Sequence, residues 1–260
     1  MTVSLDESIL TSEGNTDKTV FTKRRFFVKL TAAGMLIILI NIVIWIYLGI
    51  FDLNEPKRRD YPFRGIIAQN YSERVSAKWL SSQNCDFLYF YVSFGEWEKY
   101  KNSDKSLTDL GEIKKPFGLI HKFSFGESGK AQAEHFLKTA DNYRYELLPA
   151  VDIRYNSLYN SFTADKDSIS AQIEEYTDHI KTSLGIEPLI ITDISSLELL
   201  DTNKQKNIWY VSDSGRPEGI DSLMIWQYTE RLILDKNEKS ALFGGAVLDI
   251  GVNISDITLR

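Results

Sequence analysis

The 260-residue sequence has only one cysteine, Cys85, and three histidines. A single cysteine excludes an internal disulfide and any metal site built from several cysteines. His121, His135 and His179 lack the spacing of metal ligands, so we expect no metal and no cofactor. The 36 acidic and 30 basic side chains give a formal net charge of -6. The chain therefore lacks the broad positive surface of a nucleic-acid-binding protein.

Charged side chains are absent from one long stretch, residues 30–51, which reads LTAAGMLIILINIVIWIYLGIF. As a helix rising about 1.5 Å per residue it spans roughly 33 Å, enough to cross a hydrocarbon core about 30 Å thick. The apolar region of a cleaved signal peptide is shorter, at about 7–15 residues. We therefore expect an uncleaved transmembrane helix over residues 30–51, with the membrane as a partner.

The stretch divides the chain into parts of different composition. Residues 1–29 are rich in Ser, Thr and acidic side chains and are predicted to form a disordered tail. Residues 52–63 read as a short charged linker, and residues 64–260 as a separate domain. Basic side chains before the span only slightly outnumber those after it, which weakly favours a cytoplasmic N-terminus.

Eight short apolar segments with strand-forming residues follow one another in this domain. They are Arg64–Ala68, Phe87–Val92, Phe117–His121, Leu148–Ile153, Pro188–Thr192, Asn207–Val211, Leu223–Gln227 and Ala246–Ile250. Helical patterns separate the early ones, at Ser72–Leu80, Lys130–Ala140 and Ser168–Leu184, the last with Ser168 as N-cap. This alternation predicts an α/β protein whose parallel strands form an irregular (β/α) barrel.

The second half of the domain leaves little room for helices. Pro217 and Gly219 interrupt one connection, and Gly244 with Gly245 reads as a turn before the last strand. We therefore expect helices to be missing there. In such a barrel, function lies at the C-terminal ends of the strands. The predicted ends are rich in aromatic and hydroxyl side chains, which suit sugar rings.

Several of these segments resemble, in order, glycoside hydrolase family 25, the lysozymes that cleave the muramic acid linkage of peptidoglycan. The resemblance covers Tyr61 to the C-terminus. The matching segments are Arg64–Ile66, Asp86–Gly95, Gly118–His121, Ala131–Phe136, Leu148–Ile153, Gly185–Thr192, Ile208–Val211, Trp226–Tyr228 and Leu248–Ile250. The resemblance implies peptidoglycan glycan strands as partner and a domain on the periplasmic or extracellular side of the cell membrane. It also implies substrate-binding roles for side chains at the strand ends, namely Tyr91, His121, Trp226, Gln227 and Tyr228.

The sequence differs from the family at two positions where the resemblance implies acidic residues. The resemblance implies a carboxylate where Ile67 stands and a proton-donating glutamate where Arg154 stands, while Asp152 and Asp249 match retained acids. Glycoside hydrolysis needs one carboxylic acid and a second carboxylate. Arginine cannot donate a proton near neutral pH. Because residues two apart on a strand share a side, Arg154 is predicted to lie beside Asp152 and to lower its pKa.

Three functions remain open from the sequence. The first is a membrane-anchored, lysozyme-like domain that binds cell-wall glycan and is catalytically impaired. The second is an active muramidase with a rewired site, in which Glu96 or Glu98 replaces the lost acid. The third is a module that binds a protein partner in a cell-envelope assembly. Arg154 either contacts an anionic group of the substrate or forms an ion pair with Asp152 that fills the altered site.

Overall fold

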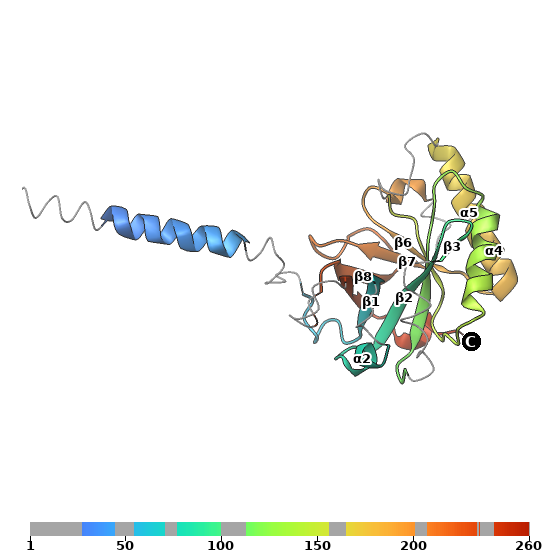
Figure 1. Ribbon diagram of the computed structural model, residues 1–260, viewed down its shortest axis with the longest axis horizontal. Coiled ribbons are helices and arrows are strands. Elements are labelled where there is room, and N and C mark those ends of the chain that lie inside the picture. The colour runs from blue at the N-terminus through green and yellow to red at the C-terminus, as the bar shows by residue number, and fades with distance from the viewer. Residues whose placement is uncertain are drawn as a thin grey trace, which may run out of the picture. The chain divides into compact units, whose positions relative to one another are not determined.

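The computed structural model describes residues 28–44, 55–70, 77–99, 113–155, 165–200, 207–232, 234 and 242–259. The chain divides into two units, Met1–Leu53 and Asn54–Arg260. Residues 28–44 of the first unit form a helix (Figure 1). The large apolar residues of this helix are 41–67% exposed. The predicted tail up to residue 27 and residues 45–51 of the predicted span lie outside the described residues. Within the described part, no helix combines the length and the apolar character needed to cross a membrane.

The second unit is built on a closed barrel of eight strands (Figure 1). Around the ring the strands follow the order β1-β9-β8-β7-β6-β5-β4-β2, and β1 pairs with β2 to close it. Each predicted strand segment overlaps one of them. The strands are β1 (Arg64–Asn70), β2 (Phe87–Phe94), β4 (Phe117–Lys122), β5 (Ala150–Asp152), β6 (Leu189–Thr192), β7 (Ile208–Val211), β8 (Leu223–Thr229) and β9 (Leu242–Leu248). A ninth, short strand, β3 (Glu98–Lys99), pairs with the end of β2.

The last strand corrects the prediction of an all-parallel barrel. β9 runs antiparallel to both β8 and β1. A parallel return needs a crossover, usually through a helix, whereas here the Leu232 N–H donates to the Phe243 carbonyl, so the segment that follows β8 pairs with the start of β9. Gly244 and Gly245 lie inside β9 rather than in a turn before it. A Cβ on Gly244 would lie 2.6 Å from Nε2 of Gln227, so a larger residue here would require the Gln227 side chain to move.

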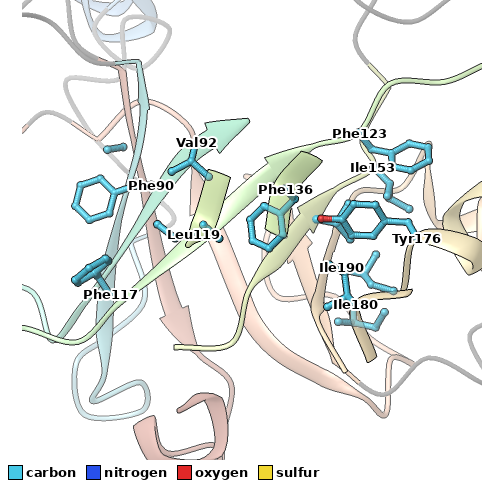
Figure 2. Packing of buried hydrophobic residues seen from close by; sticks show 14 of the residues in the cluster. Phe90, Val92, Phe117, Leu119, Phe123, Phe136, Ile153, Tyr176, Ile180 and Ile190 are labelled. Atoms are coloured by element: carbon cyan, nitrogen blue, oxygen red, sulfur yellow. The ribbon is translucent and has the colours of Figure 1, made fainter. Parts of the chain in front are cut away.

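Side chains alternate between the two faces of each strand, so the buried apolar residues form one layer inside the barrel and one outside it. Side chains such as Ile67, Tyr89 and Trp209 fill the barrel interior. The opposite faces of β2, β4, β5 and β6 are covered by α4 (Gly129–Ala140) and α5 (Lys166–Leu184), and Figure 2 shows Phe136 and Tyr176 of these helices among strand side chains. In the described residues after β6, the helical elements are the short 3-10 turns η2 (Leu197–Leu199) and η3 (Ile254–Ile257). The described residues after β6 therefore agree with the predicted loss of helices from the second half.

Three local features differ from the sequence prediction. α5 begins at Lys166 with Asp165 as its N-cap residue, two residues before the predicted start. The short helix α2 (Ala77–Ser82) covers only the end of the predicted Ser72–Leu80 segment, whose first five residues are not described. Residues 55–63, predicted as part of a linker, contact the barrel, since the Tyr61 ring packs 5.6 Å from that of Trp226.

Candidate active site

The C-terminal ends of the parallel strands form one end of the barrel, which we call its mouth. Asp152 ends β5 and pairs in register with Lys122, which ends β4. Tyr91 points into the barrel from β2. All three side chains belong to residues that are more than nine-tenths buried. The fold thus gathers a carboxylate, an ammonium and a phenol inside the mouth.

Both oxygens of the Asp152 carboxylate are engaged. Oδ2 accepts hydrogen bonds from the Tyr91 hydroxyl at 2.7 Å and from Nη2 of Arg154 at 2.9 Å, and it lies 3.0 Å from Nζ of Lys122. Oδ1 accepts from the backbone N–H of Arg154 at 3.1 Å and from its Nε at 2.9 Å. The predicted position of Arg154 beside Asp152 is confirmed, and the two side chains form an ion pair.

The surrounding charges fix the protonation of Asp152. Burial alone raises the pKa of this carboxyl, but Arg154 and Lys122 lower it further than burial raises it, so the pKa lies well below its usual range. The hydrogen bond from Tyr91 acts in the same direction. Asp152 is therefore ionised at neutral pH and holds no proton to donate to a leaving group.

A second ion pair crosses the mouth. Nη1 of Arg154 donates to Oε1 of Glu230 at 2.5 Å. Glu230 directly follows β8, and β6 and β7 lie between β8 and β5 in the ring. The pair thus joins distant parts of the barrel rim. The Glu230 side chain is 50% exposed, whereas that of Arg154 is 11% exposed.

The other altered position lies in the barrel wall. Ile67 is fully buried in the interior cluster and pairs in register with Gly244. Near it, the carboxamide nitrogens of Gln69 and Gln227 approach Gly244 from two strands. Nε2 of Gln69 is buried without a hydrogen-bond partner among the described residues. This side of the mouth presents apolar and amide groups where the family resemblance implies a carboxylate.

Asp249 lies at the opposite end of the barrel from Asp152. Because β9 is antiparallel, its C-terminal end reaches the beginning of β8, and the Asp249 N–H donates to the Met224 carbonyl at 2.9 Å. The carboxylate is held by Arg216, with Nε 2.7 Å from Oδ1 and Nη2 2.8 Å from Oδ2. The expectation that Asp249 shares a strand-end site with Asp152 assumed a parallel last strand, and the structure does not bring the two together.

Three of the predicted substrate-binding side chains point away from the barrel interior. His121 is fully buried under α4 and α5, where its ring stacks on Tyr176 at 5.2 Å. Trp226 and Tyr228 pack with Tyr61 and Val247 in a separate cluster, and Nε1 of Trp226 donates to the Ser212 carbonyl at 2.9 Å. Tyr91 and Gln227 are the predicted ligand contacts that the fold directs inward.

The two glutamates considered as replacement acids lie near β3. Oε1 of Glu96 accepts from the Ser128 N–H at 2.8 Å, at the start of α4. Glu98 is exposed in β3, and its carbonyl lies 3.0 Å from Nε2 of His135. Within the described part of the chain, no group of three or more His, Cys, Asp or Glu side chains is arranged to hold a metal ion.

Two charged residues of the mouth, Lys122 and Glu230, are not among the site residues predicted from the sequence. The signal for Lys122 was present, because strand alternation directs Lys122 inward if its neighbour His121 points outward. Glu230 directly follows a predicted strand, but no local pattern indicates a contact with Arg154, 76 residues away in the sequence.

A family model described as glycosyl hydrolases family 25 matches residues 70–236. A comparison with curated proteins gave no match.

Solved structures show the same fold at low identity. A family 25 glycosyl hydrolase from Bacillus anthracis has a TM-score of 0.63 and 19% identity over 75% of this chain and 92% of its own. The spore cortex lytic enzyme SleM from Clostridium perfringens has a TM-score of 0.62 and 15% identity over 78% and 71%. A bacterial lysozyme from Streptomyces coelicolor has a TM-score of 0.57 and 18% identity over 75% and 94%.

Proposed function

The chain belongs to glycosyl hydrolase family 25 and carries its lysozyme-like barrel, and we propose that it binds peptidoglycan glycan strands without hydrolysing them. The observation that carries this proposal is the Asp152–Arg154 pair. An ionised Asp152 and a guanidinium stand where proton donation is needed, and loss of general acid catalysis alone costs about 10²–10⁴ in rate. The buried Ile67 removes a further carboxylate from the mouth.

Glycan binding is supported by what the mouth retains. Gln69, Gln227 and Tyr91 carry hydrogen-bonding groups on strands that face the interior. Sugar hydroxyl and N-acetyl groups need such partners. Two of the similar solved structures are named as a lysozyme and a spore cortex lytic enzyme, which favours a cell-wall ligand.

We also propose that residues 30–51 anchor the domain to the cell membrane, with the barrel on the periplasmic or extracellular side. The proposal is supported by the uncharged sequence and by the exposed apolar side chains of the helix over residues 28–44. The full chain should stay in the membrane fraction after an alkaline carbonate wash, and added protease should degrade the barrel in cells with a permeabilised outer layer. Release by carbonate would overturn the anchor.

Glycan binding is tested by sedimentation of the full chain, in mild detergent, with purified peptidoglycan. The wild-type chain should pellet, and Gln69→Met, which keeps the side-chain volume but removes the amide, should pellet less. Gln83→Met is the matched control, because Gln83 precedes β2 and lies at the other end of the barrel. If the wild-type chain stays in the supernatant, the proposal fails and a protein partner becomes the better explanation.

A further inference from the structure

The guanidinium of Arg154 has two edges in different surroundings. Nε and Nη2 are bound by Asp152, whose side chain is 1% exposed. Nη1 on the outer side is paired with Glu230, whose side chain is half exposed. One edge is therefore fixed inside the barrel, and the other meets a partner at the surface.

The mouth carries one more positive charge than Asp152 can neutralise, and a negative charge at this outer edge balances it. Lys122 and Arg154 contribute two positive charges, and Asp152 neutralises one of them. Nζ of Lys122 is committed to Asp152 and to the Arg154 carbonyl, 3.0 Å away. Glu230 supplies the second negative charge.

We infer that the outer edge of Arg154 is a recognition site for a carboxylate of the glycan ligand, and that Glu230 occupies this site in the free protein. The inference rests on the proposed glycan binding and adds the chemical group that is recognised. Peptidoglycan offers this chemistry as a lactyl carboxylate on the sugar or as a carboxylate of the stem peptide. A guanidinium edge fits either one through charge-assisted hydrogen bonds.

A ligand carboxylate can replace Glu230 as a partner of Arg154, but it cannot replace Asp152. The Glu230 side chain is half exposed, so water competes for its carboxylate and the pair contributes less to stability than a fully buried pair. Removing the buried partner instead leaves buried cations without a counter-charge, which is strongly unfavourable. A ligand carboxylate can therefore replace Glu230 while Asp152 holds the guanidinium in place.

Isothermal titration calorimetry of the full chain in detergent tests the inference with defined probes. N-acetylmuramic acid carries the lactyl carboxylate, its methyl ester lacks it, and muramoyl dipeptide carries its carboxylate on the peptide. The wild-type chain should bind at least one of the two acids more tightly than the ester. Glu230→Gln should bind the preferred acid roughly two- to fivefold more tightly, the size expected for loss of an exposed competing pair, with no change for the ester.

The control is Glu187→Gln, which makes the same charge change in the Lys181–Glu187 pair before β6, at the other end of the barrel. Its affinities should equal those of the wild type. Equal binding of acid and ester, an unchanged affinity in Glu230→Gln, or no binding of either acid would each overturn the inference. If the wild-type chain still sediments with peptidoglycan in those cases, the proposed glycan binding stands and only carboxylate recognition fails.

Discussion

Arg154 holds both carboxylate oxygens of Asp152, with Nε 2.9 Å from Oδ1 and Nη2 2.9 Å from Oδ2. The two residues are two apart on the chain, so the strand itself directs them to the same side. The pair keeps Asp152 ionised. In the function proposed above, it also puts a permanent cation where a proton donor is needed.

Asp152→Asn should destabilise the barrel strongly. The change leaves Lys122 and Arg154 buried without their shared counter-charge, and a loss of about 3–5 kcal/mol in the free energy of unfolding is expected. Urea unfolding followed by tryptophan fluorescence measures it. Asp178→Asn, on an exposed face of α5, is the control and should change stability little. A loss under about 1 kcal/mol at Asp152 would contradict a buried charge network.

The buried His121 predicts how stability depends on pH. Burial lowers its pKa from 6.5 to about 3, so below pH 6.5 the unfolded chain takes up a proton that the folded protein does not. The free energy of unfolding should therefore fall as the pH falls from 6 to 4, by about 1.4 kcal/mol per pH unit from this group. Urea unfolding at several pH values measures the slope. The lowered pKa of Asp152 adds a loss of the same sign below about pH 4.

His121→Gln should flatten the slope between pH 6 and 4. The change keeps a polar side chain opposite Ser93, whose Oγ lies 2.8 Å from Nδ1 of His121. His135→Gln on α4 is the control and should keep the wild-type slope. Equal slopes in wild type and His121→Gln would show that the imidazole is not held neutral.

Asp249→Asn should weaken the protein without weakening glycan binding. The change removes the negative charge and replaces one of the two acceptors of Arg216 by an NH2 group, at a cost of about 1–3 kcal/mol in the free energy of unfolding. Sedimentation with peptidoglycan should stay at the wild-type level, because this pair lies at the end of the barrel opposite Asp152. Loss of sedimentation by a folded Asp249→Asn variant would place the glycan site elsewhere.

Two neighbours on β8 should behave differently. Gln227→Leu removes an amide from the barrel interior and should reduce sedimentation with peptidoglycan. Trp226→Phe removes an indole N–H that donates to the Ser212 carbonyl outside the barrel, so it should lower stability by about 1 kcal/mol and leave sedimentation unchanged. The reverse pattern would show that Trp226, not Gln227, faces the ligand.

The sequence predicts the barrel well because each strand is a separate apolar segment. It also predicts the Asp152–Arg154 pair, since that contact depends only on alternation along one strand. The direction of β9 follows from its antiparallel pairing with β8 and β1, which the apolar segments alone do not specify. The antiparallel course then moves Asp249 to the other end of the barrel.

Alternation also explains which of the predicted ligand contacts face the barrel interior. Trp226, Gln227 and Tyr228 are consecutive, so they cannot all face the interior, and the structure directs only Gln227 inward. By the same alternation, His121 points out of the barrel and its neighbour Lys122 points into it. The contact between Arg154 and Glu230 joins distant loops and follows from the closure of the barrel, which no local pattern contains.

Release of reducing muropeptides from purified peptidoglycan by the full wild-type chain tests the central claim most directly. The account predicts no release above a heat-denatured sample, under conditions in which an active family 25 lysozyme digests the same material and the chain itself sediments with it. Release above that of the denatured sample would contradict the account, and its loss in a folded Glu230→Gln variant would show that this carboxylate performs hydrolysis beside Arg154.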